Sequence, residues 1–508
     1  MSEPLPLDGR SLSLEQFLSV VRDGVPVAIS SEARVGVASS RRLVERAVQE
    51  ARPIYGVTTG FGKLSEHVVH PAQARTLQLS LIRSHASGTG PLLPAEIVRG
   101  MLLLRVNSLV KGHSGVRPEL IDRMVEFLTR NLVPAVPEQG SVGASGDLAP
   151  LAYIGLALIG EGSFVARTGA VEPASNVLAR EGLAPITLAE KEGVALINGT
   201  SLMASYLALS VADLRALLAA AEVAAALSFE ALLGNMESLD DRLGQLRNLP
   251  EQSKVAKAMR ALLEGSSLAG IRTEYTGQDP YTLRCIPQVL AAVELALGFG
   301  ESIVARELNA VTDNPVVFEG DVFLNGGNFH GENLALALDT LAIATQYISA
   351  FSERRIARLV HPGLNRGLPA FLAPTPGLTS GFMIPQYLAA ALVNENGGMV
   401  LPASASSLPT SADQEDFVSM GAWAGAKLRR VLTNAQRVVA VEWMVAGQAM
   451  ELRRPRTGGR GTEAALRALR EEVAPWTEDR SPAPDIDRVS RRIADGRLVA
   501  RVRSSVAF

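Results

Sequence analysis

Four long stretches with helical periodicity constrain the fold of this chain more than any other feature. They cover residues 201–234, 280–310, 331–360 and 414–452. Each is longer than the usual helix of a globular protein. Such lengths predict a bundle of long helices, which several copies of the chain could share. Aromatic residues make up only 5% of the 508 residues, while Ala and Leu are abundant, which favours helices that pack closely through small side chains.

The N-terminal region before these stretches is predicted to be smaller than the bundle and to contain both helices and strands. Ser13 and Gln16 form a capping-box pattern at the start of a helix. The best strand signals in the whole chain are "VPVAIS" near residue 28 and, between the second and third long stretches, the hairpin-like "PVVFEGDVFLNGG", which turns at Glu319-Gly320. We therefore expect a mainly α protein with an N-terminal, mostly helical domain over residues 1–200 and a long-helix bundle domain over residues 201–508.

Charge and composition exclude several kinds of partner. The net charge is -3 and charged residues are 20%, so no broad basic field is available for nucleic acid or an anionic membrane. The most apolar segment, residues 214–234, contains Arg215, Glu222 and Glu230, which is typical of a buried helix in a soluble protein. A single cysteine, Cys285, excludes an internal disulfide. With no signal-peptide pattern, we predict a cytoplasmic protein.

Metal and nucleotide sites are not predicted. His67 and His70 are three residues apart, but no nearby acid or third ligand completes a zinc signature. The chain has no Walker loop and no strand-linked GxGxxG motif. Ser145 lacks the Gly-x-Ser-x-Gly frame of a nucleophile elbow.

Polar and glycine-rich islands interrupt the helices, and each contains groups able to transfer protons, bind anions or donate amide hydrogen bonds. Taken singly, each island is more typical of a turn than of a site. The islands are "PIYGVTTGFGKLS" (53–65), "RSHASGTG" (83–90), "GSVGASGDLAP" (140–150), "ALINGTS" (195–201), "YTGQDPYTLRCIPQ" (275–288), "VTDNP", "GGNFHGE" (326–332) and "PTSADQEDFVSM" (409–420).

Taken together and in this order, the islands resemble the aromatic amino-acid ammonia-lyase family, and its histidine-specific branch most of all. The resemblance extends from about residue 55 to about residue 420 and also includes "SERRI" and "SGFMI". It implies the mainly α architecture of the ammonia-lyase and fumarase-like superfamily. It further implies a homotetramer whose active sites combine residues from three chains.

In this family an Ala-Ser-Gly tripeptide cyclises by itself to 4-methylideneimidazol-5-one, MIO, and the matching residues are Ala144, Ser145 and Gly146. The Gly146 amide nitrogen must attack the Ala144 carbonyl, and a Cβ at position 146 would obstruct that approach. Loss of the Ser145 hydroxyl as water then leaves an exocyclic methylidene. Because this electrophile is built from the chain, no external cofactor is predicted.

The resemblance also implies a role for each matching side chain. Tyr55 is the base that removes a β-proton; because free phenol has a pKa of about 10, its surroundings would have to stabilise the phenolate. Arg284 would hold the substrate carboxylate, since its fork suits a bidentate contact. The other implied roles are Asn198 and Tyr281 beside the MIO and the reacting amine, Gln278 as their support, Phe329 and Met383 as pocket residues, and Glu415 facing the substrate.

The predicted substrate depends on Ser84 and His85, which match the histidine branch, and an imidazole at His85 suits an imidazole substrate. The predicted reaction is the non-oxidative deamination of L-histidine to trans-urocanate and ammonia. Asp413, where Asn is common, and Phe417, where His often follows "QED", depart from that branch. Two alternatives remain: a tyrosine ammonia-lyase or MIO-dependent aminomutase, and an inactive helical scaffold or binding protein.

Overall fold

The computed structural model describes residues 3–271 and 277–508, which form two compact units. Each unit is assembled from three separate segments of the chain. Unit 1 comprises Met1–Leu209, Gly300–Asp339 and Pro402–Ala426, and unit 2 comprises Ser210–Phe299, Thr340–Leu401 and Lys427–Phe508. The division of the chain into domains at residue 200 stays a prediction.

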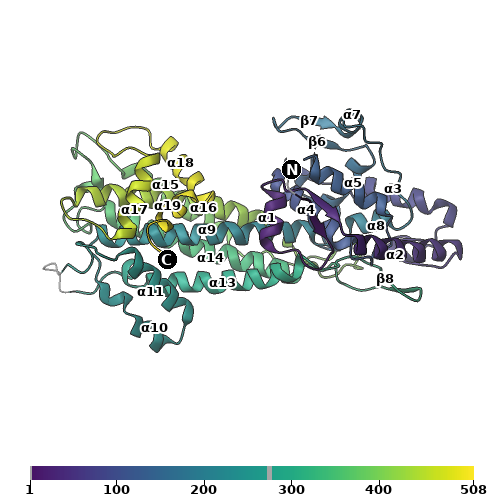
Figure 1. The fold of residues 1–508 in the computed structure, drawn as a ribbon, viewed down its shortest axis with the longest axis horizontal. Helices are drawn as coiled ribbons and strands as arrows, with labels where there is room; N and C mark the ends of the chain where they lie inside the picture. Colours follow the sequence, from purple (N-terminus) through teal and green to yellow (C-terminus); the bar gives the residue numbers. More distant parts are fainter. Residues whose placement is uncertain (1–2, 272–276) are drawn as a thin grey trace. The chain divides into compact units, whose positions relative to one another are not determined.

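The four long helices are confirmed, with two of them shorter than predicted (Figure 1). They are α9 (Ser201–Ala231), α13 (Ile286–Glu307), α14 (Glu332–Val360) and α16 (Gly421–Leu452). The predicted helix over 280–310 is interrupted at Cys285, so that residues before it form the separate turn α12 (Tyr281–Arg284). The predicted helix over 414–452 begins only at Gly421, because the residues before it form a turn at the site described below.

Helix α9 shows why the sequence favours such packing. Almost every residue from Ser201 to Ala231 is buried, Arg215 being the exposed exception. A helix that is apolar on all sides must be enclosed by other elements. Its many alanines allow those neighbours to approach closely, and alanine has the best intrinsic helix propensity.

Two of the long helices, α13 and α14, are long and apolar enough to cross a membrane by length and composition. Of the most apolar window in α14, 61% is buried inside the structure, which is typical of a core helix. The corresponding value for α13 is only 39%. Helix α13 therefore carries apolar surface that the described chain does not cover.

Besides its parts of the long helices, unit 1 contains a set of shorter helices and all the strands of the described residues. Its helices are α1 (Leu14–Val21), α2 (Ser31–Gln49), α3 (Ala74–His85), α4 (Ala95–Leu109), α5 (Pro118–Thr129), α6 (Leu148–Leu158), α7 (Ala174–Arg180) and α8 (Glu192–Ile197). Its strands are β1 (Leu5–Leu7), β2 (Val27–Ile29), β3 (Thr89–Leu92), β4 (Val133–Pro134), β5 (Pro137–Gln139), β6 (Ser163–Val165), β7 (Val171–Pro173), β8 (Val316–Phe318) and β9 (Val322–Leu324). Strands β1 and β2 pair in parallel, whereas β3–β5, β4–β6–β7 and β8–β9 pair antiparallel.

Local predictions in unit 1 are confirmed. The Ser13 hydroxyl accepts the Gln16 amide at 3.2 Å, and the Gln16 side chain accepts the Ser13 amide at 2.9 Å. The β8–β9 hairpin forms as predicted and lies beside α2 (Figure 1). There, one apolar cluster joins the hairpin and α2 to the segment that contains Tyr55; its buried members are Val44, Ala47, Ile54, Val57 and Val317.

The named secondary-structure elements in the described residues of unit 2 are all helices, joined by loops. Besides its parts of the long helices, unit 2 contains α10 (Asp241–Arg247), α11 (Pro250–Leu262), α12, α15 (Met383–Met399), α17 (Arg460–Glu472), α18 (Ala483–Ala494) and α19 (Arg497–Arg503). Helix α17 packs against α11, α18 and α19.

Candidate active site

A cavity of about 610 Å³ lies in unit 1, and every residue that lines it belongs to that unit. Its volume is within the range of small-molecule sites. The cavity brings together six of the side chains that the sequence predicts for the site: Tyr55, Ser84, His85, Ser145, Asn198 and Glu415.

The Ala144–Gly146 tripeptide lies in a tight loop immediately before α6. Gly146 has a φ of 79°, and it forms a parallel bridge with Gly199. A Cβ on Gly146 would lie 2.2 Å from the Gly199 carbonyl oxygen, so only glycine fits here. The Asp147 amide donates to that same oxygen at 2.7 Å, and the Gly199 amide donates to the Ser145 carbonyl at 3.3 Å. The loop is thus compressed against a second backbone segment.

Asp147, which follows the tripeptide, holds the loop on the start of α9. Its Oδ2 accepts the backbone amides of Leu202 at 2.8 Å and Met203 at 3.2 Å, and a carboxylate is stabilised at a helix N-terminus. Its Oδ1 is buried without a hydrogen-bond partner. Burial raises the pKa of Asp147 to about 7, although both amides and Arg105 favour the charged form.

Tyr55 presents its hydroxyl to the cavity from a loop that the apolar cluster anchors. The Gly62 amide donates to the Tyr55 oxygen at 3.0 Å, and the Phe61 ring stands edge-on at 6.4 Å. This amide would stabilise a phenolate, as the motif "GVTTGFG" suggests. Burial and the Glu415 carboxylate outweigh it, so the pKa of Tyr55 is raised above its ordinary value of 10.0. The surroundings of Tyr55 in unit 1 therefore favour the neutral phenol over the phenolate.

His85 is the last residue of α3, and the hydrogen bonds of its ring define its tautomer. Its Nδ1 lies 2.9 Å from the Leu81 carbonyl oxygen and 3.1 Å from the Ser84 hydroxyl. A carbonyl oxygen can only accept, so Nδ1 carries the proton and donates it. In the neutral ring Nε2 is then a hydrogen-bond acceptor. Burial lowers the pKa of His85, while Leu81 and Glu415 act in the opposite direction.

Glu415 faces the tripeptide from a sharply turned loop. Its Oε1 accepts the Ser145 hydroxyl at 3.4 Å, and its Oε2 accepts the Thr410 hydroxyl at 3.0 Å. Backbone hydrogen bonds between Thr410 and Glu415 close the turn. Residues 411–413 all have φ between 50° and 63°, a left-handed conformation that is strained for residues other than glycine. Asp413 is among the residue types that tolerate it best.

Asn198 reaches the cavity at the end of α8, where it is held on both sides. Its Nδ2 donates to the Asn314 carbonyl at 2.8 Å, and its own carbonyl accepts a hydrogen bond from Arg105. At the other end of α8, Lys191 is left-handed with a φ of 74° and forms an ion pair with Asp313 at 2.6 Å. Both members of this pair are fully buried.

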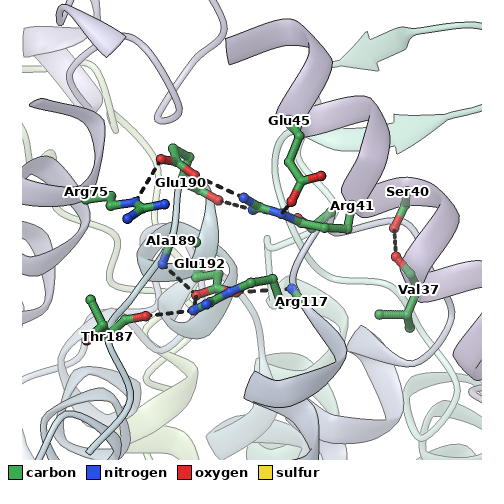
Figure 2. Close-up of polar contacts among 11 residues, drawn as sticks. Val37, Ser40, Arg41, Glu45, Arg75, Arg117, Thr187, Ala189, Glu190 and Glu192 are labelled. Carbon is green, nitrogen blue, oxygen red and sulfur yellow. Dashed lines mark hydrogen bonds and ion pairs between the residues drawn. The ribbon is translucent and has the colours of Figure 1, made fainter. Parts of the chain in front are cut away.

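The segment that leads into α8 is also fixed by charged side chains (Figure 2). The Glu190 carboxylate lies between Arg41 of α2, at 3.0 Å, and Arg75 of α3, at 3.2 Å. The Glu192 carboxylate accepts two hydrogen bonds from Arg117, each 2.8 Å long. Bidentate pairs of this kind combine charge with directional hydrogen bonds. Three elements distant in sequence thus determine where α8 begins, and with it the position of Asn198.

We expect the Asp313→Ala substitution to destabilise the protein by about 3–5 kcal/mol, because it leaves the buried Lys191 ammonium unpaired. The free energy of unfolding, measured by urea denaturation, tests this. The matched control is Asp122→Ala, which removes an exposed pair with Arg34 and is expected to cost about 0–1 kcal/mol. Equal losses in the two variants would contradict the structural role given to the buried pair.

Five predicted site residues lie elsewhere. Gln278 and Arg284 line a different cavity of about 390 Å³ in unit 2. Tyr281, over whose ring the Arg284 guanidinium lies at 4.5 Å, is 67% exposed. Arg284 has its Nε buried without a hydrogen-bond partner. Phe329 is half-buried in unit 1 and Met383 begins α15 in unit 2; neither is among the residues that line the two cavities.

Sequence reasoning missed several residues that shape the cavity. Phe61 lies within the quoted motif "YGVTTGFG", and Leu81 lies one helical turn before His85; helical spacing could have identified the second. Gln78 is fully buried and joins two parts of the site, since it donates to the Gly56 carbonyl at 3.0 Å and accepts the Val194 amide at 3.2 Å. No local pattern indicates that role.

Phe417, one of the two departures from the histidine-branch pattern, is 57% exposed. Its ring stacks on His330 with the ring centres 6.1 Å apart, and its carbonyl oxygen lies 3.2 Å from His330 Nε2. Phe417 is not among the residues that line the cavity. This departure from the histidine-branch pattern therefore lies outside the set of residues that line the cavity.

Comparison with known proteins shows the family of the chain. The family model for aromatic amino acid lyases matches residues 12–471. The chain is 47% identical to the histidine ammonia-lyase of Symbiobacterium thermophilum over 497 residues, 98% of each protein. It is also 47% identical to the histidine ammonia-lyase of Deinococcus radiodurans, over 96% of this chain and 94% of that protein.

Solved structures share the fold. The histidine ammonia-lyase of Trypanosoma cruzi superposes with a TM-score of 0.91 at 40% identity, covering 99% of this chain and 96% of that one. A tyrosine aminomutase of Streptomyces globisporus superposes with a TM-score of 0.94 at 36% identity, covering 100% and 99%.

Proposed function

Because the chain belongs to the aromatic amino acid lyase family, we propose that it is a histidine ammonia-lyase, which converts L-histidine to trans-urocanate and ammonia. The observation that carries this proposal is the unit 1 cavity, which Ser145 of the tripeptide lines together with Tyr55 and His85. Identity of 47% to two histidine ammonia-lyases over nearly the whole chain supports the choice of substrate. The cytoplasm stays the predicted compartment.

The tripeptide fits the requirements of the MIO group. Gly146 has no Cβ, as the ring closure demands, and the contact with Gly199 supports a compressed backbone. Ser145 lies with its hydroxyl toward the cavity, within 3.4 Å of Glu415. Ala144, Ser145 and Gly146 would themselves form the group. When present, the MIO group supplies an electron-poor alkene that makes a poor leaving group, here ammonia, easier to expel.

The chain's own side chains would then position the substrate and move its proton. Tyr55 accepts the β-proton at its phenolate oxygen, which the Gly62 amide already contacts at 3.0 Å. Asn198, held by Asn314 and Arg105, offers a fixed side-chain amide at the cavity wall. Glu415 adds an acceptor near the tripeptide, where an ammonium group could be held.

His85 would recognise the substrate ring. With Nδ1–H donated to Leu81, the free acceptor Nε2 pairs with an N–H of the substrate imidazole. The lowered pKa of His85 keeps the ring neutral at neutral pH, and this recognition is lost only when the pH falls below that lowered pKa. A substrate without a ring donor leaves Nε2 of the half-buried His85 unpaired, which disfavours its binding.

Copies of the chain would complete the site. The cavity in unit 1 contains no arginine among its lining residues, whereas the predicted carboxylate-binding Arg284 lies with Gln278 in unit 2. Exposed apolar side chains in unit 2, such as Leu295 of α13, Ile384 and Tyr387 of α15, supply surface for association. A homotetramer with shared active sites is therefore part of the proposal.

The main alternative function uses the same electrophile but acts on a different substrate or forms a different product. A tyrosine hydroxyl could also donate to His85 Nε2, and the structural similarity to a tyrosine aminomutase favours this as the second candidate. Tyrosine ammonia-lyase activity would produce a conjugated acid from L-tyrosine. Aminomutase activity would produce a β-amino acid instead.

Product identification with L-histidine, L-tyrosine and L-phenylalanine separates these functions, with ultraviolet absorption reporting each conjugated acid. We expect urocanate from L-histidine, and a kcat/KM that falls by roughly 10- to 100-fold in His85→Leu, because a buried substrate N–H loses its acceptor. The melting temperature of the variant controls for folding. Faster product formation from L-tyrosine, or an unchanged kcat/KM for L-histidine in His85→Leu, would contradict the substrate assignment.

A further inference from the structure

A second cavity, of about 440 Å³, lies wholly within unit 2. Residues of α9, α11, α13 and α19 form its walls, together with Ala507 and Phe508 after α19. Its volume is sufficient for a small molecule. None of its lining residues takes part in the cavity of unit 1, so any ligand here is separate from the proposed reaction.

Glu222 of α9 gives this cavity its chemical character. The residue is only 7% exposed, and it lines the cavity. Within residues 3–271 and 277–508, no hydrogen bond or ion pair joins its carboxyl group to another side chain. An unpaired polar group costs free energy when it is removed from water, and a ligand that paired with it would recover that cost.

Charged groups around Glu222 come from each neighbouring element. Lys254 and Lys257 of α11 and Arg215 of α9 line the cavity, as do Glu294 of α13 and Arg503 of α19. Lys254 and Glu294 form an ion pair at 2.8 Å. With Lys254 already paired to Glu294, Lys257 and Arg503 leave positive charge at the cavity wall, which favours an anion over a cation.

Protonation of Glu222 agrees with an anionic ligand. Burial raises the pKa of Glu222 to about 8, with Glu294 acting in the same direction and Lys254 and Arg503 opposing it. Below that pH the carboxyl group is neutral and donates a hydrogen bond. The remaining wall is apolar, formed by Leu218, Ala219 and Ala258, and the Phe508 ring lies 5.0 Å below the Arg503 guanidinium.

We propose that the unit 2 cavity binds a small organic monocarboxylate with an apolar body. The carboxylate of the ligand contacts the basic side chains Lys257 and Arg503, and one of its oxygens accepts a hydrogen bond from the protonated Glu222 carboxyl group. The apolar body lies against Leu218 and Ala219.

Binding of 4-fluorobenzoate to the full-length protein, followed by ¹⁹F NMR, tests the proposal. We expect saturable binding at pH 6.5 that weakens at pH 9, because ionised Glu222 repels the ligand and can no longer donate. E222A is expected to weaken binding about tenfold at pH 6.5, as for loss of a hydrogen bond to a charged group. E222Q, which keeps a neutral donor, should retain binding and lose most of the pH dependence. K257Q should also weaken binding.

Controls separate this site from the other cavity. R247Q removes an exposed unit 2 cation that does not line the cavity, and it should leave binding unchanged. The amine 4-fluorobenzylamine has the same body and the opposite charge, and it should not bind there. H85L should bind the probe as the unsubstituted protein does. Equal affinity in E222A, K257Q and the unsubstituted protein would overturn the proposal, and so would loss of the signal in H85L alone.

Discussion

Replacing Ser145 with alanine is expected to abolish nearly all turnover while the fold is retained. The Ser145 side chain lines the cavity and makes only a 3.4 Å hydrogen bond to Glu415, so its loss removes little packing or stability. Without a hydroxyl to leave as water, no methylidene can form. We expect kcat to fall by at least about three orders of magnitude, on the order of 4 kcal/mol of transition-state stabilisation.

Intact mass is the direct measurement for this prediction. The unsubstituted chain should weigh two water molecules less than its sequence dictates, and Ser145→Ala should not show that loss. The matched control is Ser141→Ala in the same loop, whose hydroxyl accepts the Gly143 amide at 3.1 Å but is not consumed. That variant should still lose two waters. An unmodified mass for the active, unsubstituted protein, or high turnover in Ser145→Ala, would remove the electrophile from the proposed function and favour the inactive-scaffold alternative.

Replacing Tyr55 with phenylalanine is expected to lower kcat by about 10²–10⁴-fold, the contribution typical of a positioned proton-transfer group. The ring remains available to pack against Phe61, and only the hydrogen bond from the Gly62 amide is lost, at a cost of about 1 kcal/mol in stability. The substitution should therefore lower kcat strongly while changing the free energy of unfolding only a little.

The pH profile provides an independent readout of the same role. Because the pKa of Tyr55 is raised above 10.0, the reactive phenolate fraction should increase as the pH rises toward that value, and kcat should increase with it. In Tyr55→Phe this alkaline rise should be absent. The control is Tyr153→Phe, which removes a hydroxyl that donates to the Gly88 carbonyl at 2.9 Å and does not line the cavity. A Tyr55→Phe variant with the pH profile of the unsubstituted enzyme would exclude Tyr55 as the base.

Much of the fold could be predicted from local sequence, because local rules govern it. The periodicity of α9 and α14, the Ser13 capping box and the β8–β9 hairpin all depend on residues close together in the chain. Where a predicted helix boundary was wrong, a short non-helical segment interrupted the helical pattern. Helix α16 begins at Gly421, because the strained turn around residues 411–413 occupies the segment before it.

The candidate site could be predicted only as a set of motifs, and its geometry required the structure. Sequence identified the tripeptide, Tyr55 and His85, but only the fold shows that Ser145, Tyr55 and His85 line one cavity. The tautomer of His85 depends on the Leu81 carbonyl, whose direction no residue pattern reveals. Arg284 belongs to the same set of motifs and nevertheless lies in the other unit.

By itself, the sequence determined the long helices, the mainly α class and the tripeptide. Helix propensity depends on neighbouring residues, and the tripeptide consists of three consecutive residues, so all of these are local properties. Tertiary structure alone decided that Gly199 compresses the backbone at Gly146, and that Lys191 finds its counter-charge in Asp313. These partners are 53 and 122 residues apart in the chain. Close approach and burial of charge arise only when distant segments pack together, so no local pattern can specify them.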